Sequence, residues 1–178
     1  RATTIVEFAP GSYFDAHTHD GGEEYLVLSG VFSDESGDYS AGTYVRNPIG
    51  TWHKPHTKDG CRILVKLHQF AADDTAHFST DTTEGELADS AVEGVTLLSL
   101  HSVQGEQVAM QRFASGVSWA NQRLSGGQEV YVMDGTLSDE HGSYPAGTWI
   151  RNPDGFHHTL SSDPGPLLWI TTRHLTCP

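Results

Sequence analysis

The chain has 178 residues, with 10 Lys and Arg against 23 Asp and Glu, so its formal charge is −13. An acidic excess of this size repels phosphate backbones and anionic lipid surfaces, so we expect neither a nucleic-acid partner nor a membrane partner. No segment approaches the ~20 consecutive apolar residues that a membrane-spanning helix needs. With 37% hydrophobic residues, 19 Gly and 8 Pro, the composition is typical of a globular, turn-rich protein with much β-structure.

The cysteine usage bears on the cellular compartment. Cys61 and Cys177 are far apart in the sequence, and neither belongs to a CxxC motif. Isolated cysteines of this kind are typical of reduced thiols, so we expect a cytoplasmic protein.

The first 70 residues contain four short runs rich in β-branched and aromatic residues, separated by Gly, Pro, Asn and Asp. Runs with this composition and spacing predict the strands of a β-sandwich or a β-barrel. We expect these strands at residues 4–8, 25–32, 43–45 and 63–70.

Residues 71–94 differ in composition, because they are rich in Asp, Glu, Ser, Thr and Ala. We expect an acidic linker here, with one short helix over residues 84–91. Residues 95–178 then form a second domain.

An internal repeat relates the two halves of the chain. Residues 24–53 align with residues 129–158 without a gap at a constant offset of 105, and sixteen of the thirty positions are identical. Self-similarity of this kind indicates a duplicated domain. The repeat predicts two copies of one β domain, at residues 1–70 and 95–178, joined by the linker at 71–94.

Charged residues are repeated as well. The acidic pair at 34–35 recurs at 139–140, and Arg46 recurs as Arg151. We expect the acidic pair to form a turn in each copy, and the two arginines to pair with these acids.

Three histidines and one glutamate in the first copy have a spacing that predicts a metal site. His17 and His19 are two residues apart, so on a strand their side chains point to the same face. Glu23 follows after a Gly-rich turn, and His53 comes after a Pro-Ile-Gly turn. Imidazole nitrogens bind divalent transition metals, and a carboxylate lowers the net charge of such a site.

The spacing of these residues resembles the two motifs of the cupin superfamily. The first motif is Gly11, five residues, His17-Thr18-His19, three residues, Glu23, six residues and Gly30; the second is Gly42, five residues, Pro48-Ile49-Gly50, two residues and His53. The residues between the motifs are similar to those of ChrR-type cupins. That group includes the C-terminal domains of zinc-dependent anti-sigma factors and dioxygenases of the dihydroxyacetophenone type.

The resemblance implies an all-β fold with two tandem jelly-roll cupin barrels. It also implies that the first barrel holds one divalent transition metal, with zinc expected first and iron, nickel or manganese left open. The implied metal ligands are His17, His19, Glu23 and His53. Glu24, which recurs as Glu129, is a rival ligand, but the motif spacing favours Glu23 and strand alternation turns Glu24 elsewhere.

The second copy keeps only one of the four ligands. The positions that correspond to the ligands are Gln122, Leu124, Gln128 and His158. Leucine has no lone pair and amide oxygens are weak ligands of transition metals, so we expect the second barrel to be metal-free. The alternative left open is a polar pocket of Gln122, Gln128, His157 and His158 for an organic ligand.

Three functions follow from the resemblance. The first is a regulatory cupin that senses a small molecule or an oxidant in transcriptional control. The second is a cupin metalloenzyme, a dioxygenase or related oxidoreductase, in which Glu23 acts as the catalytic base on a small oxygenated substrate. The third is a metal-stabilised assembly domain.

The expected partner is a small-molecule ligand or substrate. In anti-sigma factors of this type, an N-terminal helical zinc domain binds the sigma factor. These residues contain no such domain, so a protein partner of that kind would need a segment outside this sequence. We expect a monomer or a homodimer.

Overall fold

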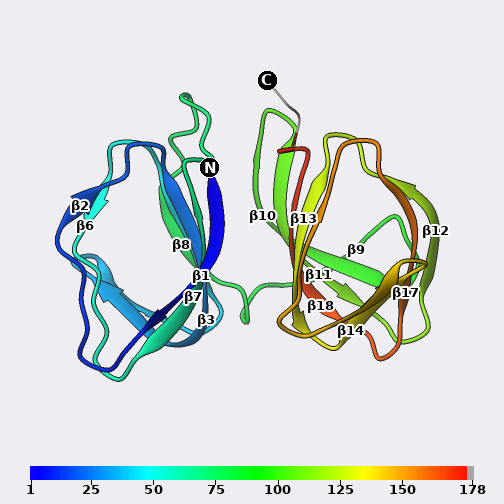
Figure 1. Ribbon diagram of the computed structural model, residues 1–178, viewed down its shortest axis with the longest axis horizontal. Coiled ribbons are helices and arrows are strands. Elements are labelled where there is room, and N and C mark those ends of the chain that lie inside the picture. The colour runs from blue at the N-terminus through cyan, green and yellow to red at the C-terminus, as the bar shows by residue number, and fades with distance from the viewer. Residues whose placement is uncertain (176–178) are drawn as a thin grey trace. The chain divides into compact units, whose positions relative to one another are not determined.

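The computed structural model describes residues 1–175 (Figure 1). The chain divides into two compact units, Arg1–Gly85 and Glu86–Pro178, which we call unit 1 and unit 2. All regular secondary structure among the described residues is β-strand, so the all-β prediction is confirmed. Residues 1–175 include no helix with the length and apolar composition that crossing a membrane requires.

Unit 1 contains the four strands that its sequence predicts and several shorter ones. Its strands are β1 (Ala2–Phe8), β2 (His17–Thr18), β3 (Glu23–Asp34), β4 (Gly37–Ser40), β5 (Thr43–Asn47), β6 (Trp52–His53), β7 (Cys61–Leu67) and β8 (Phe78–Asp81). β7 ends earlier than predicted, because His68 has a φ of +57° and leaves the extended conformation.

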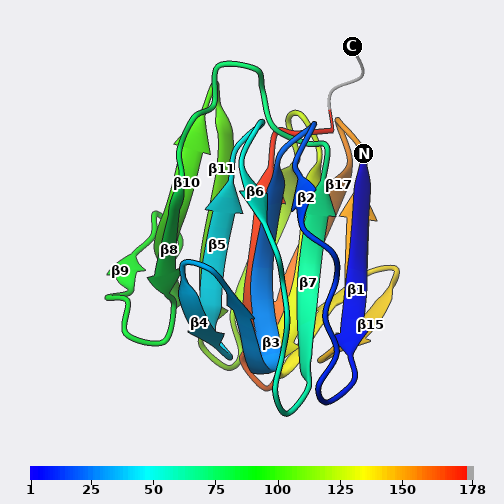
Figure 2. The ribbon, with the colours of Figure 1, turned by 90° about the vertical axis from the view of Figure 1, so that its left-hand side faces the viewer.

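Unit 1 has two layers (Figures 1 and 2). The larger is an antiparallel sheet of strand order β1-β7-β3-β5-β8, with β4 paired to the second half of β3. The smaller is the two-stranded sheet of β2 and β6, which lies in front of β3 and β7 in Figure 2. The hydrophobic core consists of Phe8, Tyr25, Val27, Phe32, Val45, Cys61, Ile63 and Val65. Cys61 is a free, buried thiol, and Cys177 lies outside the described residues.

A repeated glycine fixes the turn before β6. Gly50 has a φ of +86°, a conformation that a side chain would strain. Its N–H donates to the backbone oxygen of His19 at 3.0 Å, which ties this turn to the segment that carries two predicted ligands. In unit 2, Gly155 has a φ of +75° and donates in the same way to Leu124 at 2.8 Å.

Unit 2 consists of two antiparallel sheets. Its strands are β9 (Ala88–Asp89), β10 (Val95–Val103), β11 (Glu106–Phe113), β12 (Ser118–Arg123), β13 (Gln128–Asp134), β14 (Thr136–Asp139), β15 (Gly142–Pro145), β16 (Trp149–Asn152), β17 (His157–Ser162) and β18 (Leu167–Thr172). The strand orders are β16-β13-β18-β11-β10-β9 and β12-β17-β14-β15. The core consists of Val95, Ala109, Phe113, Val130, Val132, Leu137, Leu160, Leu168 and Ile170.

The sheets differ from two closed barrels. None of the sheets formed by residues 1–175 closes on itself. In unit 1, β2 and β6 pair with each other and with neither edge strand of the larger sheet, so the two layers face each other without a continuous ladder.

Residues 71–94, expected as a linker, contribute a strand to each unit. β8 pairs with β5 of unit 1, and β9 pairs with β10 of unit 2. The short helix expected over 84–91 is wrong: Ala88 and Asp89 are extended, and they pair with Leu97 and Thr96. Pairing with a neighbouring strand satisfies their backbone groups, which overrides a weak local helix preference.

Candidate metal centre

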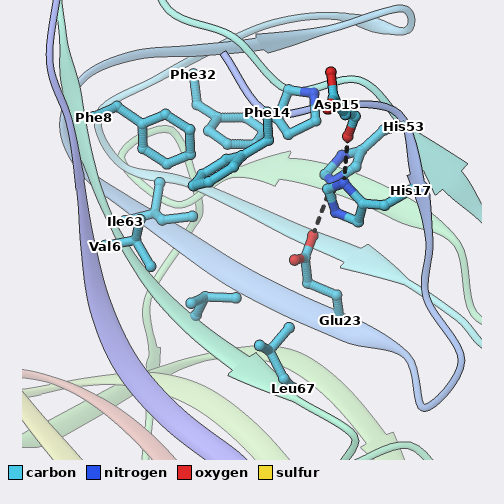
Figure 3. Close-up of a pocket in the computed structure, with 12 residues that line it drawn as sticks. Val6, Phe8, Phe14, Asp15, His17, Glu23, Phe32, His53, Ile63 and Leu67 are labelled. Carbon is cyan, nitrogen blue, oxygen red and sulfur yellow. Dashed lines mark hydrogen bonds and ion pairs between the residues drawn. The ribbon is translucent and has the colours of Figure 1, made fainter. Parts of the chain in front are cut away.

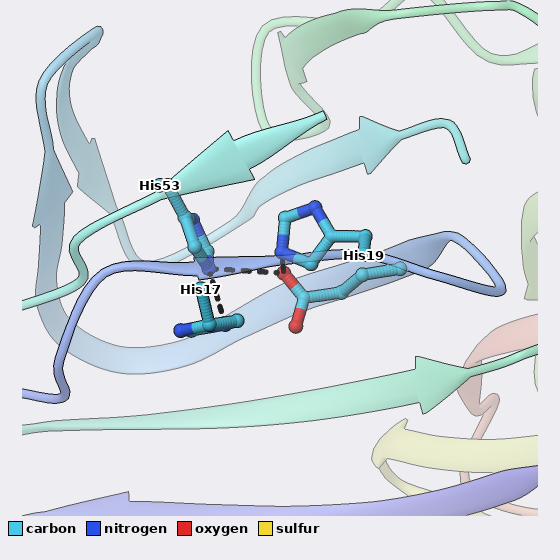
Figure 4. Close-up of side chains that lie close together, drawn as sticks. His17, His19 and His53 are labelled. Carbon is cyan, nitrogen blue, oxygen red and sulfur yellow. Dashed lines mark hydrogen bonds and ion pairs between the residues drawn. The ribbon is translucent and has the colours of Figure 1, made fainter. Parts of the chain in front are cut away.

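Three segments of unit 1 bring the predicted ligands together. β2 pairs with β6 so that His17 lies opposite His53. His19 follows one residue after β2, and Glu23 begins β3 in the larger sheet. One potential ligand atom from each of the four side chains lies within 4.8 Å of the others (Figure 4).

The facing atoms have the spacing of ligands around one ion. Nε2 of His53 lies 3.1 Å from Nε2 of His17. Oε1 of Glu23 lies 3.5 Å from Nε2 of His19 and 3.6 Å from Nε2 of His53. Two nitrogen ligands at ~2.0–2.1 Å from one ion are about 2.9–3.4 Å apart, depending on the geometry. The cluster therefore has the dimensions of a single metal site.

Hydrogen bonds hold the opposite ring nitrogens of His17 and His53. Nδ1 of His17 lies 2.9 Å from the backbone oxygen of Asp15, and Nδ1 of His53 lies 3.4 Å from Oδ2 of Asp34. A backbone carbonyl and a carboxylate can only accept, so both Nδ1 atoms carry the proton. In the neutral rings, Nε2 then carries a lone pair.

A threonine plays the same part for His19. Nδ1 of His19 lies 2.9 Å from Oγ1 of Thr51, and the Thr51 hydroxyl donates to the backbone oxygen of Pro48 at 2.7 Å. Because the hydroxyl proton is already used, the threonine oxygen accepts the Nδ1 proton of His19. Nε2 of His19 therefore carries a lone pair too.

Three lone pairs thus face one point. At 3.1 Å the Nε2 atoms of His17 and His53 repel each other unless a cation lies between them. Nε2 of His19 is buried and has no hydrogen-bond partner. A divalent transition metal supplies the missing partner for all three nitrogens, so this donor set fits such an ion.

Burial sets the protonation of the cluster. Desolvation, together with neighbouring His53 and His17, lowers the pKa of His19 from 6.5 to about 4, so this ring is neutral at physiological pH. Burial raises the pKa of Glu23 above its ordinary value. Burial also opposes ionisation of Asp34, but hydrogen bonds from His53 and a backbone N–H outweigh it and hold the Asp34 pKa low.

A cavity of about 450 Å³ opens onto the cluster (Figure 3). His17, Glu23 and His53 form its polar wall, with Asp15 beside them. The remaining lining residues are apolar: Val6, Phe8, Phe14, Phe32, Pro55, Ile63, Val65 and Leu67. A small, mainly apolar molecule could therefore lie directly against the metal ligands.

Strand alternation sends Glu24 to the opposite face of β3, away from the cluster. Its carboxylate is buried, 2.6 Å from Nη1 of Arg46 and 3.7 Å from Nζ of Lys66, and it accepts from the Tyr44 hydroxyl at 2.5 Å. Arg46 also pairs with Asp74 at 2.5 Å. These ion pairs hold the Glu24 carboxylate on that face of β3, away from the ligand cluster.

The expected pairing of Arg46 and Arg151 with the repeated acidic pair is wrong. Arg46 pairs with Glu24, and Arg151 lies 3.7 Å from Glu129. Each arginine stands directly opposite its glutamate in the strand register. The signal was present in the sequence, because Glu24 and Arg46 are repeated together as Glu129 and Arg151.

The repeated acidic pair forms the expected turn and also orients a histidine. Asp34 accepts from the backbone N–H of Ser36 at 2.8 Å and holds His53. In unit 2, Asp139 accepts from the N–H of His141 at 2.8 Å and contacts Nδ1 of His158 at 3.2 Å. Sequence reasoning missed this second role, although the joint repetition of acid and histidine indicates it.

Unit 2 has hydrogen bonds where unit 1 has converging lone pairs. Gln122 lies opposite His158 in the β12–β17 ladder, as His17 lies opposite His53. Nε2 of His158 lies 3.0 Å from the terminal amide of Gln122; because Nδ1 donates to Asp139, the hydrogen bond here is one that the Gln122 NH2 group donates to Nε2 once the amide O and N are exchanged. The His157 side chain is exposed and takes no part in this contact.

The fold matches that of known cupins. The structure of a candidate dioxygenase from Nostoc punctiforme aligns with a TM-score of 0.83 and 14% identity, over 99% of this chain and 70% of that one. A Bacillus subtilis oxalate decarboxylase, whose Mn(II) centres were studied, aligns at 0.68 and 13%, over 98% and 69%. A Cupin 2 conserved barrel domain protein from Leptotrichia buccalis aligns at 0.67 and 13%, over 94% and 81%. At these identities, the likeness defines a cupin fold alone.

The family follows from the sequence itself. The model of the ChrR cupin-like domain matches residues 1–71 and again residues 75–176. The chain therefore belongs to the ChrR cupin-like domain family, and the resemblance inferred from its motifs is confirmed. No curated protein sequence matches the chain.

Proposed function

We propose that this protein is a metal-dependent cupin enzyme of the dioxygenase type, acting on a small apolar molecule that carries oxygen donors. The observation that carries the proposal is that three of the four candidate ligands, His17, Glu23 and His53, form one wall of a 450 Å³ cavity. A structural metal site is closed by its protein ligands, whereas a catalytic site keeps a position open to substrate.

We also propose that each unit is one jelly-roll cupin barrel. The two layers of unit 1 and the repeated strand order support this, as does the likeness to cupin structures. In this arrangement the metal centre of unit 1 lies between the layers, with the histidines on one and Glu23 on the other.

The metal in this proposal is one divalent ion held by His17, His19, Glu23 and His53. When bound, it would act as a Lewis acid toward an oxygen of the substrate. Iron, manganese and nickel accept five or six ligands and so leave room for substrate beside these four, whereas zinc is satisfied by four.

The chain supplies binding, orientation and a proton acceptor. Phe8, Phe14 and Phe32 offer aromatic faces to the apolar part of the substrate. The Glu23 carboxylate is on the cavity wall, where it can take a proton from the substrate hydroxyl or α-carbon. No Lys or Arg lines this cavity, which belongs wholly to described residues, and Asp15 adds negative charge. A small dianion such as oxalate would therefore have no cationic partner other than the metal, which disfavours it relative to a neutral or singly charged substrate.

Elemental analysis and oxygen uptake test the proposal together. Protein purified without a histidine tag should contain about one iron, manganese or nickel per chain. It should consume oxygen with at least one member of a panel of catechols and β-diketones, and the double variant His17→Ala/His19→Ala should lose both metal and uptake. About one zinc per chain with no uptake would contradict the enzyme.

A second candidate is a regulatory cupin that senses a small molecule or an oxidant. Membership of the ChrR cupin-like family favours it. In that case, zinc-loaded protein should bind apolar oxygenated compounds, or respond to hydrogen peroxide, without turnover. A ligand that raises the melting temperature of the protein and is recovered chemically unchanged, as mass spectrometry of the ligand shows, would indicate sensing. Conversion of the ligand would indicate catalysis.

A further inference from the structure

Unit 2 contains a cavity of its own, of about 380 Å³. Its polar wall includes four glutamines, together with serine and threonine hydroxyls. The lining residues are Ser90, Ala91, Val92, Leu97, Ser99, Gln107, Val108, Ala109, Gln111, Trp119, Gln122, Gln128, Ile170 and Thr172. All of them belong to unit 2.

The cavity is at the same place in the fold as the cavity of unit 1. Six lining positions of unit 1 recur at an offset of 105 in the lining of unit 2. The pairs are Val6 and Gln111, Phe14 and Trp119, His17 and Gln122, Glu23 and Gln128, Val65 and Ile170, and Leu67 and Thr172. At these positions unit 2 has three amides and a hydroxyl where unit 1 has two metal ligands and two apolar residues. The other two positions are apolar in both units.

Two of the amides are deeply buried. Gln111 is 7% exposed and Gln128 is 4% exposed. Both side chains border the cavity. Buried polar groups need hydrogen-bond partners, so amides on a cavity wall favour a bound molecule that can both donate to them and accept from them.

The corner that corresponds to the metal centre is closed. His158 is held by Gln122 at 3.0 Å and by Asp139 at 3.2 Å. The space beside these side chains is only about 10 Å³, at most the size of one water molecule. A molecule in the larger cavity would therefore have no metal ion beside it at this corner.

The chemistry of the lining defines the class of ligand. No Asp, Glu, Lys, Arg or His lines the cavity within the described residues, so a charged molecule would lose its hydration without compensation. Amides donate and accept hydrogen bonds, as hydroxyl groups do. Trp119 and Leu97 offer an apolar surface to carbon-bound hydrogens. We propose that unit 2 binds a small, uncharged, polyhydroxylated molecule, such as a monosaccharide or a cyclic polyol.

Ligand-observed NMR and calorimetry on the full chain test this proposal. The probes are D-glucose, D-galactose, D-ribose and myo-inositol, with D-glucuronate, D-glucosamine and uracil for comparison. At least one neutral polyol should bind, and at least tenfold more tightly than each comparison compound. The variant Gln111→Val, which copies Val6 of unit 1, should weaken this binding at least tenfold.

Matched variants keep the result specific. Val6→Gln and the metal-ligand variant His17→Ala/His19→Ala should leave polyol binding unchanged, because they alter unit 1 only. Gln128→Leu provides a second disruption if Gln111→Val melts at a lower temperature. The proposal is overturned if no neutral polyol binds, if uracil or a charged sugar binds more tightly, or if both glutamine variants bind like the wild type.

Discussion

Units 1 and 2 share one arrangement of strands and turns but differ in the side chains that it brings together. In both, a strand pair places a histidine opposite a second polar residue, and an aspartate from the repeated turn holds that histidine at Nδ1. In unit 1 the remaining lone pairs converge on one point, whereas in unit 2 an amide satisfies the surviving His158. The comparison teaches that one arrangement of strands and turns supports two chemistries: converging lone pairs in unit 1 and a side-chain contact between His158 and an amide in unit 2.

The surroundings of the ligands have changed together with the ligands. Thr51, which accepts from His19, corresponds to Phe156, which has no acceptor. Asn47, which donates to Glu23 at 3.3 Å, is retained as Asn152. Unit 2 thus lacks part of the supporting hydrogen bonds as well as three ligands, and restoring a ligand alone would give a weaker site.

The largest expected effect comes from one substitution made in each unit. His53→Ala should remove the whole metal equivalent, because the site keeps only three ligands and loses the nitrogen 3.1 Å from His17. His158→Ala should leave the metal content unchanged. Metal per chain, measured by plasma mass spectrometry, checks both, and metal loss from the His158 variant would mean that unit 2 holds an ion.

A second pair of variants compares the repeated arginines. Arg46 is 2% exposed and bonded to Glu24 and Asp74, whereas the Arg151 side chain is 59% exposed. Arg46→Ala leaves two buried acids with too few partners and should cost about 3–5 kcal/mol of unfolding free energy. Arg151→Ala should cost less than about 1 kcal/mol. Urea denaturation measures both, and equal losses would contradict the burial difference.

Removal of the metal should destabilise one unit only. At free metal about 100 times the Kd, binding contributes about 2.7 kcal/mol to the stability of the unit that holds the ion. For a domain of this size, each kcal/mol shifts the melting temperature by about 4–8 °C. Calorimetry with and without EDTA should therefore show one transition that moves and one that stays. The His53→Ala protein is the control, since EDTA should not move either of its transitions.

The strand positions and the ligand cluster could be predicted from the sequence for physical reasons. Alternation along β3 separates Glu23 from Glu24, and the repeat identifies strands and turns twice. Motif spacing brought the four candidate ligands into one group, which the structure places within 4.8 Å. These features depend on local geometry and register, which short sequence patterns record.

Other features depend on contacts between distant residues. Asp74 comes from the expected linker, yet it completes the charge network of Arg46, and no local pattern indicates that contact. Thr51 and Asp34 support ligands that lie 32 and 19 residues away in the sequence. β9 was expected as helix because two residues carry little periodicity, and pairing with β10 decides their conformation.

The smallest effect predicted tests whether these supporting contacts matter. Thr51→Val removes the acceptor of His19 Nδ1 at nearly constant volume. The variant thereby resembles unit 2 at this position, because the corresponding residue Phe156 has no acceptor. Loss of such an outer hydrogen bond typically weakens metal binding about 10–100-fold, which is about 1.4–2.7 kcal/mol. Competition with a chromogenic chelator measures the affinity, and Thr51→Ser, which keeps the hydroxyl, should stay within about threefold of the wild type.

The paired outcomes of Thr51→Val and Thr51→Ser decide how His19 is oriented. If the valine variant binds metal as tightly as the wild type, the tie from Gly50 N–H to the His19 backbone is sufficient to aim the ring, and Phe156 in unit 2 is a neutral change. If only the valine variant weakens, the hydroxyl fixes the tautomer that presents Nε2. Unit 2 then lacks both the ring, replaced by Leu124, and the hydroxyl that orients it, replaced by Phe156.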